Sequence, residues 1–115
     1  MRNDKENIIV DLTFQFALRI IEFVEILEEK RKFVIANQLL KASTSIGANV
    51  CEAQNAESKA DFIHKMKIAA KEADETKYWL KLCEKSTNYP YNASLSENVL
   101  VIIKILAKII GTSKR

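Results

Sequence analysis

The sequence predicts an all-α protein with an antiparallel up-down-up-down four-helix bundle, and three observations lead to this fold class. The 115-residue chain has only two glycines and one proline, the residues that the many turns of strand-rich folds require. Hydrophobic residues make up 48% of the chain and charged residues 29%, which is typical of a globular protein. Apolar residues recur at three- and four-residue steps, the period of amphipathic helices. We therefore expect one domain over residues 1–115, with helices at about 5–30, 33–55, 58–86 and 95–110.

The first predicted helix has a wide apolar face. A second row, formed by Ala17, Ile21 and Val24, lies beside the main row. A face of this width indicates a helix that packs against two neighbours rather than one. The main row consists of Ile9, Leu12, Phe16, Ile20, Phe23 and Leu27.

The second predicted helix contains an unusual run of small residues, LLKASTSIGANVCEA, at positions 39–53. A glycine in a helix interior costs about 1 kcal/mol relative to alanine, so a helix that keeps one usually gains close contact with a neighbour. The run has no glycine-rich phosphate-binding pattern and no strand-turn-helix context for a nucleophilic serine. We therefore expect Ser43, Gly47 and Val50 to allow a neighbouring helix to approach closely.

The last two predicted helices have recognisable ends. Ser58 with Asp61, and Ser94 with Glu97, have the spacing of a capping box, in which side chains satisfy backbone N–H groups at a helix start. Gly111 is expected to end the last helix. The third helix has a heptad seam, and the fourth has a narrow core face beside further apolar rows. The seam is Phe62, Met66, Ala69, Ala73, Thr76, Leu80 and Cys83, and the core face is Leu95, Val99, Ile102, Leu106 and Ile109.

The sequence offers little for catalysis or metal binding. Di-iron four-helix bundles use two Glu-x-x-His pairs as metal ligands. This chain has one histidine, His64, and Asp61-x-x-His64 is its nearest approach to such a pair. Cys51 and Cys83 form no CxxC pair, and we expect both in or near the core. We therefore expect no enzyme activity, no cofactor and no metal. With no signal peptide and no apolar run of about 20 residues, a cytoplasmic location is expected.

Basic residues are the strongest functional signal in the chain, whose net charge is +3. Lysines at helical spacing can follow a phosphate backbone. The alternative is that such lysines, interleaved with acidic residues, only keep a helix solvated. The candidate nucleic-acid-binding residues are Lys67, Lys71, Lys77, Lys81 and Lys85, with Arg31 and Lys32 as secondary candidates.

Two further features indicate contacts with other chains. Tyr78 and Trp79 are adjacent, so they cannot both enter the core, and such residues dominate protein interfaces. The apolar rows of the fourth helix are too wide to be hidden within one small bundle, which favours self-association.

Two stretches together resemble the proteins encoded by intervening sequences in bacterial 23S rRNA genes, also called S23 ribosomal proteins. They are QLLKASTSIGANVCEA at 38–53 and ESKADFIHKMKIAAKEADETKYWL at 57–80, with Ala53 where the family usually has glycine. The resemblance implies a four-helix bundle that assembles into a ring-shaped homopentamer and is not an enzyme. It also implies likeness in fold to accessory proteins of diversity-generating retroelements, which bind nucleic acid and a reverse transcriptase.

The resulting expectation is an oligomeric protein that binds RNA or another nucleic acid through basic helix faces. An oligomer repeats the modest positive charge of each subunit, so that several weak contacts act together on one nucleic acid. The alternative is a scaffold that recruits a partner enzyme such as a reverse transcriptase, with Tyr78, Trp79 and the surface of the fourth helix as contacts.

Overall fold

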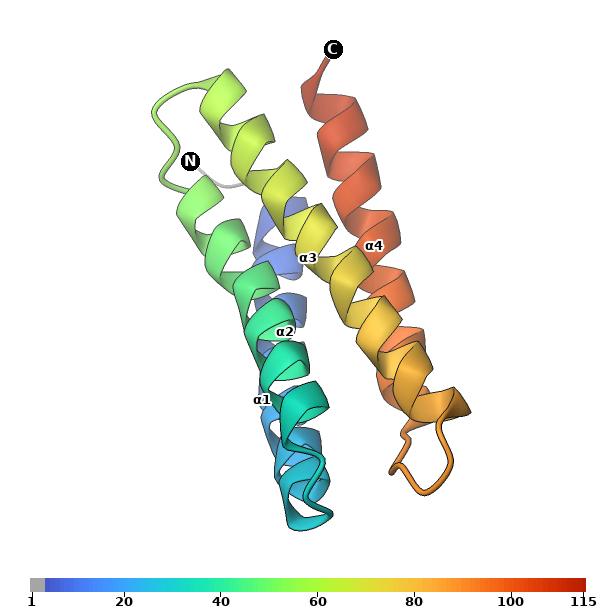
Figure 1. The fold of residues 1–115 in the computed structure, drawn as a ribbon. Coiled ribbons are helices and arrows are strands. Elements are labelled where there is room, and N and C mark those ends of the chain that lie inside the picture. The colour runs from blue at the N-terminus through green and yellow to red at the C-terminus, as the bar shows by residue number, and fades with distance from the viewer. Residues whose placement is uncertain (1–3) are drawn as a thin grey trace.

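Four helices make up the fold in the computed structural model, which describes residues 4–115 (Figure 1). α1 spans Asp4–Glu29, α2 spans Phe33–Ala53, α3 spans Lys59–Lys85 and α4 spans Ala93–Ser113. Successive helices run in opposite directions, and residues 4–115 contain no strand. The bundle measures 46 × 20 × 19 Å. The predicted all-α antiparallel four-helix bundle is therefore confirmed.

Each helix packs against the helices next to it in the chain, and α4 returns to contact α1. Helices joined by short connections become antiparallel neighbours, which explains this order. The contact between α1 and α4 is the least extensive of the four. No helix in the described part of the chain is both long and apolar enough to cross a membrane.

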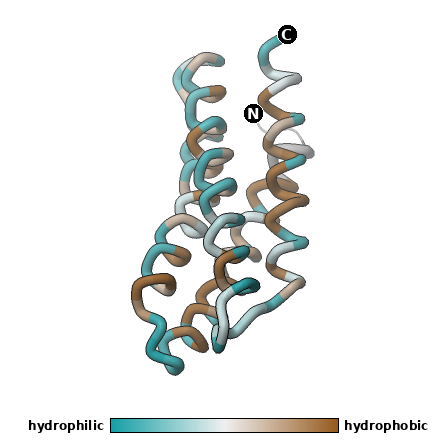
Figure 2. The backbone as a smooth tube through the Cα atoms, turned by 45° about the vertical axis from the view of Figure 1, so that its right-hand side comes forward, coloured by the Kyte–Doolittle hydropathy of each residue, from teal (hydrophilic) through white to brown (hydrophobic). Residues whose placement is uncertain are grey.

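The core lies where the predicted apolar faces meet. In α3 the seam from Met66 to Cys83 is buried as predicted, while Phe62 at its start is only partly buried. In α4 all five residues of the predicted core face are buried, while Leu100 in the next row is 41% exposed. Figure 2 shows hydrophobic residues on successive turns of α4, more than a single core-facing row requires. The excess apolar width of α4 was correctly predicted.

The small residues of α2 face the bundle interior. Ser43 and Val50 are fully buried, and the Ser43 hydroxyl donates to the carbonyl of Leu40 in its own helix (3.3 Å). A Cβ atom placed on Gly47 would lie 3.4 Å from the Thr13 hydroxyl oxygen of α1. That distance is an ordinary van der Waals contact, so the site has room for a methyl group and little more.

Of the three predicted helix ends, one is correct and two are wrong. Ser58 caps α3, since its hydroxyl accepts from the Asp61 N–H (3.0 Å), and the Asp61 carboxylate accepts from the Glu57 N–H (3.2 Å). Asn92, rather than Ser94, caps α4, and its side-chain oxygen accepts from the Ser94 N–H (3.0 Å). Asparagine is as good an N-cap as serine, and it comes first in the chain.

Gly111 does not end α4, which continues to Ser113. No atom lies within 4 Å of a Cβ built on Gly111, and none of the described glycines has a positive φ. Glycine stops a helix when it adopts the left-handed conformation, and here it remains helical.

Candidate nucleic-acid interface

The candidate interface is the solvent-facing side of α3, opposite its buried seam. Because the seam from Met66 to Cys83 faces the core, the positions on the opposite side of α3 point away from the bundle. All five lysines predicted on this helix are exposed. We call them the lysine face: Lys67, Lys71, Lys77, Lys81 and Lys85.

The residues along this side of α3 follow a regular order. Lys71, Tyr78 and Lys85 are seven residues apart, which is close to two helical turns, so they share one side of the helix. At 1.5 Å per residue, each lysine lies about 10.5 Å along the axis from Tyr78. Asp74, Glu75 and Glu84 are exposed in the same stretch and interrupt the lysines. The outer side of α3 is therefore rich in lysine, with acidic side chains between the lysines and the aromatic Tyr78 among them.

The lysines of this face form no ion pair with another described side chain. Among residues 8–115, whose side chains the structure describes, one ion pair forms, between Lys65 of α3 and Glu52 of α2 (3.1 Å). It joins two neighbouring helices and lies outside the lysine face. The lysine ammonium groups therefore remain available to external anions.

Tyr78 and Trp79 form an aromatic pair beside the lysines. Their rings meet edge to face, with centroids 5.3 Å apart and an interplanar angle of 70°. Tyr78 is 56% exposed, whereas Trp79 is partly buried and packs against the core. The Trp79 indole N–H donates to the Glu75 carboxylate one turn earlier (3.2 Å). Tyr78 is thus the outward-pointing member of the pair.

The secondary candidates Arg31 and Lys32 lie in the connection between α1 and α2. Arg31 is exposed and adopts a left-handed backbone conformation (φ 62°). The Lys32 ammonium lies 4.7 Å from the centre of the Tyr89 ring, in a cation–π contact with the loop between α3 and α4. Lys32 therefore links two connections at one end of the bundle. Arg31 is the more exposed of the two cations.

The cysteines and the histidine that were considered as catalytic or metal-binding residues do not form a common site. Cys83 is buried, and this burial raises the pKa of its thiol to about 11, which disfavours the reactive thiolate. Cys51 is exposed, so the expectation that it belongs to the core was wrong. Cys51 follows the buried Val50, and consecutive side chains of a helix point about 100° apart, so Cys51 is turned away from the core. His64 is exposed, and no three His, Cys, Asp or Glu side chains in the described residues cluster as metal ligands.

Sequence reasoning missed the role of Arg19, whose side chain on α1 forms hydrogen bonds with α4. Its guanidinium donates to the Ser94 hydroxyl (3.1 Å) and, with the Asn98 amide turned to fit, to the Asn98 side-chain oxygen. In that orientation the Asn98 nitrogen donates to the Ser94 carbonyl (3.1 Å). The signal was present, since Arg19 is the one basic residue between Ile8 and Glu29.

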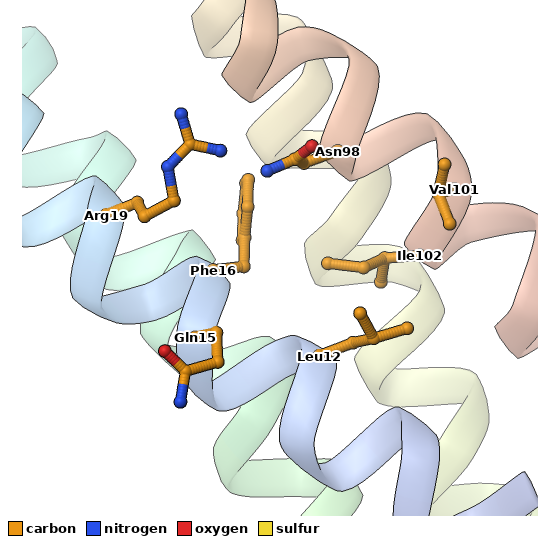
Figure 3. Close-up of a pocket in the computed structure, with 7 residues that line it drawn as sticks. All are labelled: Leu12, Gln15, Phe16, Arg19, Asn98, Val101 and Ile102. Atoms are coloured by element: carbon orange, nitrogen blue, oxygen red, sulfur yellow. The ribbon is translucent and has the colours of Figure 1, made fainter.

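Arg19 stands at the edge of a shallow groove of about 150 Å³ between α1 and α4. Figure 3 shows the Phe16 ring between the two helices, with Arg19 and Asn98 on either side of it. The remaining lining residues are Leu12, Gln15, Val101 and Ile102. A groove of this volume is smaller than a typical small-molecule site of about 300–1,000 Å³.

Fold and surface together define an all-α four-helix bundle with exposed lysines along the outer side of α3. The sequence profile of the 23S rRNA-intervening sequence protein family matches residues 5–111, and the chain belongs to this family. The predicted membership is confirmed.

A solved structure supports the same assignment. It is a protein with unknown function from the S23 ribosomal protein family of Bacteroides thetaiotaomicron VPI-5482. The two chains are 42% identical, with a TM-score of 0.87 over 93% of this chain and 98% of the other. No curated protein matches the chain.

Proposed function

We propose that this protein is a non-enzymatic, cytoplasmic, oligomeric bundle that binds RNA or another nucleic acid through the lysine face of α3. The observation that carries the proposal is that all five lysines are exposed and none takes part in an ion pair with another described side chain. Phosphates attract unpaired ammonium groups and release bound counterions when they are neutralised. Membership of a family named for intervening sequences of 23S rRNA agrees with a partner of this kind.

Assembly into a ring, with five subunits expected from the family resemblance, is part of the proposal. Apolar side chains on the outer side of α1 support it, because Phe14 is 59% exposed, Leu18 44% and Ile21 42%. They follow i, i+4, i+7 spacing and so form one stripe. An exposed apolar stripe marks a surface for protein contacts. If the lysine face is repeated around an oligomer, several weak sites bind one RNA together, and the overall affinity exceeds that of a single subunit.

Salt dependence of RNA binding tests the electrostatic part directly. Anisotropy of a labelled RNA would be measured with the wild type at several salt concentrations. We expect affinity to fall steeply as salt rises, with a log–log slope that reflects the number of phosphates contacted. The double variant Lys71→Gln, Lys81→Gln should have a slope smaller in magnitude by about 1.4–1.8.

The matched control removes two exposed lysines elsewhere, Lys41→Gln on α2 and Lys108→Gln on α4. Net charge changes equally in both double variants, so only the position of the charges differs. Equal losses in the two variants, or affinity that does not depend on salt, would contradict binding through the lysine face.

The second candidate function is a scaffold that recruits a partner enzyme such as a reverse transcriptase. The exposed stripe on α1 and the exposed Leu100 and Val101 of α4 favour it, because they offer more apolar surface than a lone monomer needs. Under this alternative, Phe14→Glu would abolish recruitment of the enzyme, while changes to the lysine face would leave recruitment intact.

A further inference from the structure

Tyr78 is the strongly exposed member of an aromatic pair on a surface rich in lysine. It is the one large hydrophobic side chain of α3 that is strongly exposed, at 56%. Its neighbours on the outer side of the helix are charged: Lys71 and Lys85 two turns away, Lys81 one turn away, and Asp74 one turn before it. A protein-binding hot spot is normally surrounded by further apolar contacts that exclude water. Beside Tyr78 the apolar contact is the ring of the partly buried Trp79, and the exposed neighbours on α3 are charged.

We propose that the lysine face binds single-stranded nucleic acid, with an unpaired base stacked on the ring of Tyr78 and phosphates held by the lysines on either side. The inference rests on the proposed function and names the form of nucleic acid that the same site takes. Aromatic side chains in a positively charged groove or face are the usual means of holding single strands, because every base has a flat apolar surface. In a duplex those surfaces are already stacked on one another.

The Tyr78 ring is held in place before any ligand arrives. It meets Trp79 edge to face, and Trp79 is itself fixed by packing against the core and by its hydrogen bond to Glu75. A ring restrained in this way loses little conformational entropy when a base stacks on it. The pair therefore favours stacking more than a freely rotating surface tyrosine would.

The two carboxylates near Tyr78 determine where the phosphates lie. Asp74 is exposed, and Glu75 accepts from Trp79, so these two carboxylates outweigh Lys77 and disfavour a phosphate in the middle of the face. Lys71 and Lys85 lie about 10.5 Å along the axis on either side of Tyr78, and Lys81 lies about 4.5 Å from it. The arrangement fits a neutral base at the centre, with phosphates of the neighbouring nucleotides at the lysines.

The test compares a labelled oligouridine strand with an RNA duplex of equal length. Tyr78→Leu keeps an apolar side chain of good helix propensity but removes the ring, and Tyr78→Phe keeps the ring as the matched control. We expect Tyr78→Leu to weaken binding of the single strand by about 5- to 150-fold and to change duplex affinity little. Tyr78→Phe should bind the single strand within about twofold of the wild type.

Trp79 supplies a second readout, because it is the only tryptophan in the chain and touches Tyr78. Its fluorescence should be quenched as oligouridine binds the wild type and the Tyr78→Phe variant. Circular dichroism and native mass should be the same for all three proteins, since Tyr78 lies outside the core.

Each result decides between the two proposals. Unchanged single-strand affinity in Tyr78→Leu, with a loss in the Lys71→Gln, Lys81→Gln variant, overturns the stacking inference and leaves the proposed function standing. A lower native mass in Tyr78→Leu also overturns it, because the ring would then belong to a subunit contact. Wild-type protein that binds neither the single strand nor the duplex overturns both proposals.

Discussion

α1 and α3 are almost equal in length, at 26 and 27 residues, yet their solvent-facing sides differ in chemistry. On α1 most outward side chains described are apolar or acidic, such as Phe14, Leu18 and Glu22, and Arg19 is occupied by α4. On α3 the outward side carries the lysine face with acidic residues between the lysines, and Tyr78 is its one large, strongly exposed apolar residue. An acidic and apolar surface repels phosphate and suits protein contacts, whereas an unpaired basic surface attracts phosphate. Under the proposed function, the two helices would contact different partners.

The largest expected effect comes from making α3 resemble α1 in charge. Lys67→Glu, Lys71→Glu, Lys81→Glu and Lys85→Glu together should lower RNA affinity by a thousandfold or more, because four attractive phosphate contacts become repulsive. Binding would be followed by anisotropy, with the native mass as a check on assembly. Reversal of four exposed lysines elsewhere serves as the control: Lys41, Lys104, Lys108 and Lys114. If both quadruple variants lost affinity equally, net charge rather than the α3 surface would be responsible.

Gly47→Leu should destabilise the whole bundle, because the larger side chain pushes α2 away from α1. The added side chain has no space against Thr13, and we expect a loss of about 3 kcal/mol in the free energy of unfolding, measured with denaturant. Gly47→Ala is the control. Its methyl group fits at 3.4 Å and raises helix propensity, so stability should be unchanged or higher by up to about 1 kcal/mol. Equal stability of the two variants would show that α1 can move away at little cost.

Phe14→Glu with Leu18→Glu should act directly on the α1 surface, and on RNA binding only through the loss of assembly. Both residues are exposed in the single chain, so helicity should persist while the native mass falls toward the 13.1 kDa of one subunit. RNA affinity should then fall by about a hundredfold through loss of multivalency, although no lysine has changed. Phe14→Leu, which keeps an apolar residue, should retain the assembly. A native mass unaffected by the two glutamates would exclude this stripe as a subunit contact.

Arg19→Met should have the smallest effect. It removes the hydrogen bonds to Ser94 and Asn98 but keeps apolar contact with Phe16, so we expect a loss of about 1 kcal/mol in unfolding free energy. RNA affinity should not change, since Arg19 lies on α1. A clear loss of RNA binding without a loss of stability would place phosphate contacts on the α1 side and contradict the comparison.

The sequence predicted the helices well because the heptad seam of α3 and the core face of α4 repeat without interruption. Helix ends were harder, since Asn92, Ser94 and Gly111 all have suitable residue types for a boundary. Only the surrounding backbone decides which of them caps a helix. The exposure of Cys51 was missed because position 51 is adjacent to the buried Val50, and composition alone favours burial of cysteine.

The sequence by itself determined the fold class, the family and the lysines of α3, because these depend on periodicity and residue type along one helix. The tertiary structure decided which groups are free and which are occupied. It placed Arg19 against α4, Lys32 over Tyr89, and Trp79 against the core while Tyr78 points outward. The physical reason is that a side chain's availability depends on its neighbours from other helices. Those neighbours lie far away along the chain and are brought together only by packing.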